Sequence, residues 1–140
     1  EDLTAARQQN ARHYSELLRQ HGCHSEVILP KTLPESRHVY NQYCIRFRHG
    51  LRDSVMQSLR EQQIGCAVYY PKPLHLQTCF ADLGYHAGQF PVAEAAARDV
   101  LALPIYSELP AVHQERIVLA VRDALQSATG TSSQSARRAA

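Results

Sequence analysis

The sequence has no tryptophan, one methionine and only two lysines, and its apolar residues never form a long run. No stretch approaches the roughly 18 consecutive apolar residues that a membrane-spanning helix needs, so we expect no membrane partner. The remaining basic residues are arginines, which alternate with acidic residues and leave a net charge of +2. Because nucleic-acid binding requires clustered positive charge, we expect a solvated surface and no nucleic-acid partner.

The usual self-contained catalytic signatures are also missing. The six glycines are too scattered to cradle a phosphate with backbone N–H groups, and no G-x-S-x-G or G-x-G-x-x-G is present. The four cysteines form no C-x-x-C pair and no spacing typical of a secreted disulfide framework. We expect Cys44 and Cys66, which lie in apolar runs, to be small buried hydrophobes in a reducing cytoplasm.

Two groups of reactive side chains are candidate sites. His21, Cys23 and His24 form the densest cluster of metal-ligand types, but no matching pair lies elsewhere, so we expect no metal. His75 and Cys79 stand one helical turn apart and could form a nucleophile pair. A core cysteine beside a loop histidine is the simpler interpretation, and we expect no catalytic residue here.

What is present fits one globular domain. The 140 residues include 44% apolar and 20% charged residues, ordinary values for a soluble protein with a real core. Residue periodicity and breakers predict the following elements. Helices are expected over 2–21, 51–64, 91–98 and 110–126, with a short one from about 74; strands are expected over 26–29, 38–48, 66–70 and 100–105. The pattern favours an α+β fold, with helices packed on one side of a small, mainly antiparallel sheet.

The chain divides into three parts. We predict a linker helix over residues 1–22, a small α+β domain over 23–126 and a disordered tail over 127–140. The tail contains no large apolar residue, so it cannot bury enough surface to become ordered. The chain does not begin with methionine, and we expect a preceding domain to which the first helix connects it.

The segment from residue 69 to 75 is the best candidate for a binding site. Tyr69, Tyr70, Lys72 and His75 place two phenols, an ammonium and an imidazole on a short stretch of backbone stiffened by two prolines. Such a polar and aromatic edge can hydrogen-bond a polyhydroxylated ligand or a phosphate while its rings make apolar contacts. From the residues alone, a strand end with surface aromatics explains the same pattern.

An ordered series of short motifs carries a resemblance to one family. The motifs are Tyr40-Asn41-Gln42-Tyr43, Arg52-Asp53, Ile64-Gly65, the 70–75 loop, Leu83-Gly84-Tyr85, Phe90-Pro91-Val92-Ala93-Glu94, Leu103-Pro104-Ile105-Tyr106 and Glu108-Leu109. Over residues 4–126 this series resembles the C-terminal domain of the DegT/DnrJ/EryC1/StrS sugar aminotransferases. The resemblance implies the small domain of a fold-type-I enzyme that depends on pyridoxal phosphate.

The resemblance also implies a chemistry. Members of the family are cytoplasmic homodimers that transfer an amino group, generally from glutamate, to a keto sugar linked to a nucleotide. The cofactor forms a Schiff base with a lysine of the larger, N-terminal domain. Neither Lys31 nor Lys72 lies in the serine-rich context that the family uses for this lysine, so we expect no cofactor-binding residue and no turnover in this chain alone.

By the same resemblance, Tyr69, Tyr70, Lys72 and His75 lie nearest the substrate's sugar. Many members have histidine where this chain has Tyr69. A phenol titrates near ~10 and an imidazole near ~6.5, so a role that needs imidazole protonation is not expected at this position. Some relatives that replace the lysine by histidine catalyse sugar dehydration, and this reaction stays an alternative for the longer protein. A free-standing small-molecule-binding or regulatory module and an interaction domain that uses its first helix stay open as well.

Overall fold

The computed structural model describes residues 2–138, and the side chains of residues 2–130. Four α-helices, three strands and three short 3-10 helices make up the described fold. In chain order they are α1 (Asp2–Gln20), η1 (Cys23–Ser25), β1 (Val27–Ile28), β2 (Tyr43–Phe47), α2 (Arg52–Glu61), η2 (Leu74–Leu76), η3 (Thr78–Leu83), α3 (Pro91–Asp99), β3 (Val100–Leu103) and α4 (Ala111–Arg138).

The sheet is antiparallel throughout and has the order β1-β2-β3. Val27 pairs with Phe47 at one end of β2, and Tyr43 pairs with Leu103 at the other. Alternate residues of β2 face the core, so Tyr43 and Phe47 are buried while Cys44 is only half-buried. The predicted α+β fold with a small antiparallel sheet is confirmed.

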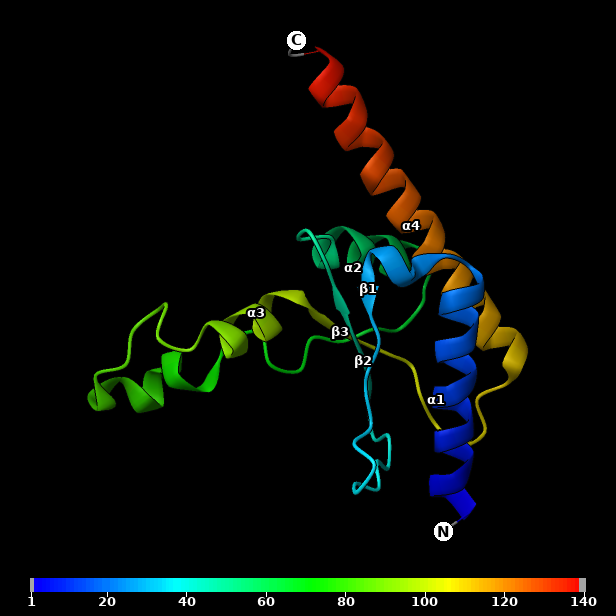
Figure 1. The fold of residues 1–140 in the computed structure, drawn as a ribbon, viewed down its shortest axis with the longest axis horizontal. Coiled ribbons are helices and arrows are strands. Elements are labelled where there is room, and N and C mark those ends of the chain that lie inside the picture. Colours follow the sequence, from blue (N-terminus) through cyan, green and yellow to red (C-terminus); the bar gives the residue numbers. More distant parts are fainter. Residues whose placement is uncertain (1, 139–140) are drawn as a thin grey trace.

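One core lies between the inner face of the sheet and helices α1, α2 and α4. Its largest fully buried side chains come from all of these elements: Tyr14, Leu18, Tyr43, Ile45, Phe47, Val55, Leu59, Leu101, Gln114, Val118 and Val121. Helix α1, which we predicted as a linker, shares this core with the rest of the domain and packs against α4 (Figure 1). The Tyr14 ring stacks on Tyr43 with centroids 5.0 Å apart, and its hydroxyl donates to the Pro104 carbonyl at 2.9 Å.

Strand β2 begins five residues later than the alternation predicted. Tyr40 has a φ of 49°, in the left-handed region, which a β-strand cannot accommodate. The Tyr40 N–H donates to His38 Nδ1 at 3.0 Å, and α1 holds the preceding carbonyls through Arg7 and Gln8. The segment before Tyr43 is therefore a loop attached to α1.

Two further boundaries differ from the prediction. The expected strand over 66–70 is reduced to a single bridge between Ala67 and Ala102. Helix α2 ends before Gly65, since Gln63 takes the left-handed conformation with a φ of 58° and Ile64 then bonds back to Leu59. A non-glycine residue thus terminates this helix, and the glycine signal was misleading.

Helix α4 is assigned through residue 138 and so includes residues 127–138, the segment for which we predicted a disordered tail. Two hydroxyl side chains bond within the helix: Ser127 donates to the Asp123 carbonyl at 2.9 Å, and Thr129 donates to the Leu125 carbonyl at 2.9 Å. Residues 139–140 of the predicted tail lie outside the described residues. Among the helices described, none is both long and apolar enough to cross a bilayer.

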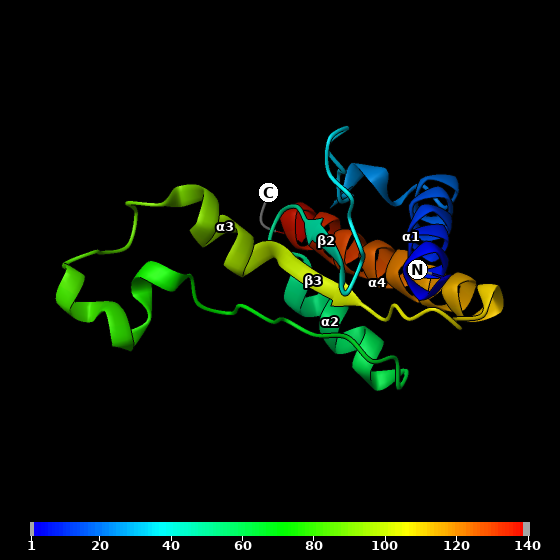
Figure 2. The ribbon, with the colours of Figure 1, turned by 90° about the horizontal axis from the view of Figure 1, so that it is seen from below.

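Residues 71–90 form an arm that leaves the body on the side opposite α1 (Figures 1 and 2). It carries η2 and η3 and returns to the sheet through α3, which leads directly into β3. None of residues 71–90 is fully buried, so the arm contributes nothing to the core. Its conformation must be maintained by contacts of its own.

Candidate functional site

A cavity of about 390 Å³ lies on the outer face of the sheet, at the base of the arm. β2 and β3 form its floor, and the chain from residue 67 to 77 and helix α3 form its walls. The lining residues are Gln42, Cys44, Ala67, Val68, Tyr69, Tyr70, Lys72, Pro73, Leu74, Gln77, Ala93, Ala96, Ala97, Val100 and Ala102. Alternation along β2 produces this outer face, because Tyr43 and Ile45 point to the core on the other side.

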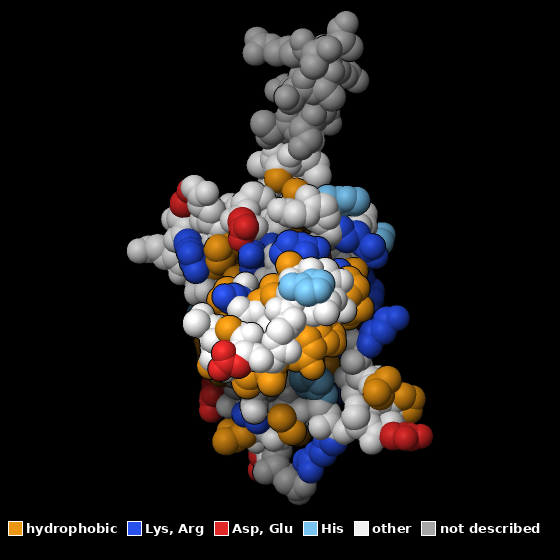
Figure 3. Space-filling view, turned by 90° about the vertical axis from the view of Figure 1, so that its left-hand side faces the viewer, with side chains coloured by type: hydrophobic (Ala, Val, Ile, Leu, Met, Phe, Trp, Pro, Cys, Tyr) orange, Lys and Arg blue, Asp and Glu red, His pale blue; other side chains and the backbone are white. Residues whose placement is uncertain are grey.

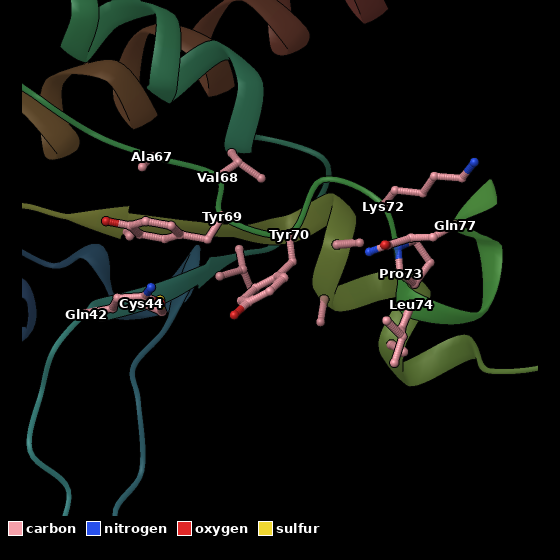
Figure 4. A pocket seen from close by; sticks show the side chains of 15 residues that line it. Gln42, Cys44, Ala67, Val68, Tyr69, Tyr70, Lys72, Pro73, Leu74 and Gln77 are labelled. Carbon is pink, nitrogen blue, oxygen red and sulfur yellow. The ribbon is translucent and has the colours of Figure 1, made fainter. Parts of the chain in front are cut away.

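Three of the four predicted site residues line this cavity. Tyr69 and Tyr70 are exposed, and their rings lie against the sheet side of the cavity (Figure 4). The Lys72 side chain extends away from the two rings, at the arm end (Figure 4). Within the described lining Lys72 is the only charged residue, while the amides of Gln42 and Gln77 add polar groups.

This arrangement can bind a ligand that is partly polar and partly apolar. The rings of Tyr69 and Tyr70 offer flat apolar surface and phenol hydroxyls that donate and accept hydrogen bonds. The amides of Gln42 and Gln77 can pair with hydroxyl groups, and the Lys72 ammonium can attract an anion. A sugar carrying a phosphate has this combination of groups.

The fourth predicted residue, His75, is placed elsewhere. Its side chain is 8% exposed, and its Nε2 lies 3.1 Å from Glu94 Oε1 at the start of α3. The ring packs against Phe90, with centroids 4.7 Å apart. Cys79, the other half of the candidate nucleophile pair, is exposed, and its thiol lies near Gln77 Oε1. His75 therefore points into the arm and not into the cavity.

Glu94 gathers the hydrogen bonds at the base of the arm. Its carboxylate accepts from the Gly88 N–H at 2.8 Å, from the Phe90 N–H at 3.3 Å and from His75. Burial of the carboxyl opposes ionisation, but these hydrogen bonds outweigh it, and the pKa of Glu94 is lowered. Gly88 has a φ of 93°, a conformation that a residue with a side chain rarely adopts.

The arm presents a large amount of apolar surface. Viewed from the arm's side, the molecule shows apolar side chains gathered around the arm, with lysines and arginines at the margin (Figure 3). The exposed apolar residues of the arm and its two ends are Tyr69, Tyr70, Leu74, Leu83, Tyr85, Phe90 and Val92. Exposed apolar residues gathered in this way are typical of a surface that meets another protein surface or a ligand.

The cysteines and histidines form no second site. Within residues 2–138, no group of three or more His, Cys, Asp or Glu side chains is placed to hold a metal ion. Cys44 and Cys66 are half-buried, less than we expected, and Cys23 is the fully buried cysteine. Burial raises the pKa of all three thiols, which favours the unreactive form.

The cavity does not fit pyridoxal phosphate by itself. The cofactor needs a lysine, a partner for its ring nitrogen and donors for its phosphate. Lys72 is exposed, and the described lining offers no carboxylate for the ring nitrogen. Lys31 is also exposed and lies outside this lining.

Sequence reasoning missed Gln42, Gln77 and Glu94. The alternation of β2 did place Gln42 on the face opposite the core, and this signal could have identified it as a lining residue. Pro91 predicted a helix that includes Glu94, but nothing in the sequence pairs Glu94 with His75, which lies 19 positions earlier.

Comparisons with known proteins agree with this architecture. A curated relative from Geobacillus stearothermophilus, named a pleiotropic regulatory protein, is 43% identical over 115 residues, which are 82% of this chain and 30% of the relative. A dTDP-3-amino-3,4,6-trideoxy-alpha-D-glucose transaminase from Micromonospora megalomicea is 37% identical over 69% of this chain and 26% of its own length. A solved DegT DnrJ EryC1 StrS aminotransferase from Brucella abortus superposes with a TM-score of 0.75 at 32% identity, over 88% of this chain and 31% of that one.

This chain thus spans about 30% of the length of the first of these curated relatives. The sequence model of the DegT/DnrJ/EryC1/StrS aminotransferase family matches residues 1–122, which include every strand, the arm and the cavity. With a match of this extent, the chain belongs to the DegT/DnrJ/EryC1/StrS aminotransferase family.

Proposed function

We propose that this chain is the small C-terminal domain of a longer aminotransferase that depends on pyridoxal phosphate and acts on keto sugars linked to a nucleotide. In this proposal the outer face of the sheet is one wall of the substrate site. Glutamate is the amino donor, the whole enzyme is a cytoplasmic homodimer, and its larger N-terminal domain carries the cofactor lysine. The chain alone neither holds the cofactor nor turns over substrate.

The observation that carries the proposal is the cavity at the base of the arm. Its lining brings Tyr69, Tyr70 and the amide of Gln42 onto one face, and Lys72 lies at its arm end with the side chain extended away from the two rings. These groups suit a nucleotide-linked sugar, whose hydroxyls, apolar ring face and phosphates need hydrogen bonds, aromatic contact and positive charge. Several relatives have names that state such substrates, among them a UDP-2-acetamido-2-deoxy-3-oxo-D-glucuronate aminotransferase from Pseudomonas aeruginosa.

The exposed apolar arm supports the same proposal. A surface that carries Tyr70 at 72%, Leu74 at 65% and Val92 at 78% exposure is costly to leave in water. In the longer enzyme this surface packs against protein that the 140 residues do not include. The separate cofactor domain supplies that protein, and it completes a site of which only one wall is present here.

The first test concerns the cofactor. The longer protein mixed with pyridoxal phosphate should develop the visible absorbance of a lysine-linked cofactor, and the 140-residue chain should not. Borohydride reduction followed by peptide mapping should then label a lysine outside residues 1–140. Labelling of Lys72 in the isolated chain would overturn the proposal that another domain carries the cofactor lysine.

The second test concerns the wall. In the longer protein, Tyr70→Ala should lower kcat/KM for the sugar nucleotide by roughly ten- to a hundredfold, because a buried aromatic contact and a hydrogen bond are lost. Lys72→Ala should raise KM with little change in kcat if it meets a phosphate that does not react. Val112→Ala, at an exposed side chain of α4 outside the cavity lining and the arm, is the control. Unchanged kcat/KM in the Tyr70 and Lys72 variants would remove this face from the site.

A regulatory module is the competing proposal, and the names of two relatives favour it: the pleiotropic regulatory protein and an erythromycin biosynthesis sensory transduction protein from Saccharopolyspora erythraea. The lysine experiment separates the two. A longer protein that binds no pyridoxal phosphate would support the module, whereas transfer of an amino group from glutamate to the sugar would support the enzyme. A bound cofactor with loss of water from the sugar would indicate a dehydratase.

A further inference from the structure

The arm has few means of keeping its shape. None of residues 71–90 is fully buried, and the pairing of the chain with β3 ends at Ala67. Within the arm, the backbone hydrogen bonds described for η2 and η3 join residues three positions apart. The cavity nevertheless depends on the arm, since Lys72, Pro73, Leu74 and Gln77 all line it.

We propose that His75 and Glu94 form a clamp that closes the base of the arm and positions the cavity wall. In the His75–Glu94 clamp the carboxylate joins the outgoing chain, through His75, to the returning chain, through the N–H groups of Gly88 and Phe90. His75 is thus a positioning residue and does not contact the substrate. The effect of the clamp on substrate binding rests on the proposed function, whereas the clamp itself does not.

The position of the clamp explains how it reaches the site. Leu74 directly precedes His75, Ala93 directly precedes Glu94, and both Leu74 and Ala93 line the cavity. Fixing the two clamp side chains therefore fixes two neighbours that form the wall. The rings of Phe90 and Tyr85 extend the contact, with His75–Phe90 centroids at 4.7 Å and Tyr85–Phe90 centroids at 5.3 Å.

The clamp is made of strong interactions in a sheltered place. The His75 side chain is 8% exposed and that of Glu94 is 16% exposed, so water competes little for their hydrogen bonds. The carboxylate accepts from two backbone N–H groups at the start of α3, where the helix dipole also favours negative charge. Loss of the carboxylate would leave three donors unpaired at once.

The test uses the 140-residue chain and amide hydrogen exchange measured residue by residue. His75→Phe keeps the ring against Phe90 but removes the donor, and Glu94→Gln removes the charge. We expect both variants to speed exchange at Gly88 and Phe90 by about tenfold or more, while the core amides of β2 exchange as before. Glu115→Gln and His113→Phe, which change exposed side chains of α4, are the matched controls and should leave exchange unchanged.

His75→Gln provides the rescue. Its amide nitrogen reaches about as far as Nε2 of histidine and can donate to Glu94, so exchange at Gly88 and Phe90 should return to within about threefold of the original. Exchange that stays unchanged in His75→Phe and Glu94→Gln would overturn the clamp, as would failure of His75→Gln to restore protection. Because cofactor absorbance tests the proposed function and exchange in this chain tests the clamp, either one can fail without the other.

Discussion

Replacing Tyr14 measures how far α1 belongs to the core. The side chain is fully buried, stacks on Tyr43 and donates its hydroxyl to the Pro104 carbonyl at 2.9 Å. Tyr14→Phe keeps the ring and leaves that carbonyl without its partner, which costs about 1 kcal/mol because Pro104 is only half-buried and water can reach it. Tyr14→Ala removes the ring as well, and we expect a loss of roughly 3–5 kcal/mol.

Urea unfolding followed by circular dichroism gives both values. For a chain of this size, 1 kcal/mol corresponds to about 4 °C in Tm, so Tyr14→Phe should also be visible in a thermal scan. Tyr69→Phe, at an exposed tyrosine, is the control and should change stability by less than about 0.5 kcal/mol. A loss below about 1 kcal/mol for Tyr14→Ala would refute the shared core and restore α1 as a separate linker.

Three further predictions concern pH and association. Burial raises the pKa of Tyr43 to about 12 and also raises the pKa of Tyr14. The stability that these two phenols contribute is therefore complete below the ordinary tyrosine pKa of 10.0 and is lost as the pH rises through their pKa values in the folded protein. In an alkaline titration, the tyrosinate absorbance of Tyr14 and Tyr43 should appear only when the chain unfolds. The pKa of Glu94 is lowered by hydrogen bonds that outweigh burial, so the clamp should hold at the ordinary glutamate pKa of 4.5 and open as the pH falls further; an NMR titration that found the ordinary value for Glu94 would contradict this. The exposed apolar arm should make the isolated chain self-associate, and light scattering that showed a monomer at high concentration would count against the proposed interdomain surface.

The elements with strong local signals could be predicted from the sequence. Alternating Tyr43, Ile45 and Phe47 identified β2 and its buried face, and Pro91 marked the first turn of α3. The start of β2 could not be predicted, because the left-handed Tyr40 depends on hydrogen bonds from α1, about 30 positions away. Local composition was misleading around residues 127–129, where the hydroxyls of Ser127 and Thr129 bond within α4 instead of breaking it.

The candidate site, too, could be predicted from the sequence only in part. Tyr69, Tyr70 and Lys72 follow a strand-like segment, and their place at a sheet face could be anticipated from neighbouring residues. The position of His75 could not, since its partner Glu94 belongs to a helix that begins only after the arm has left the body and returned. A single sequence gives no sign that these two side chains meet, and a histidine beside two tyrosines is therefore easily assigned to the ligand.

The separation of the arm from the core bears on how such a domain can evolve. Apart from His75, which contacts Glu94 and Phe90, and Gly88, which has a φ of 93°, the residues between 71 and 90 lie outside the core, so folding places little restraint on most of that segment. Grafting the corresponding segment of a relative between Tyr70 and Pro91, with His75 and Gly88 kept, should thus leave the fold of the scaffold unaltered. Substitutions in the arm can therefore change ligand preference without earlier stabilising mutations in the rest of the domain.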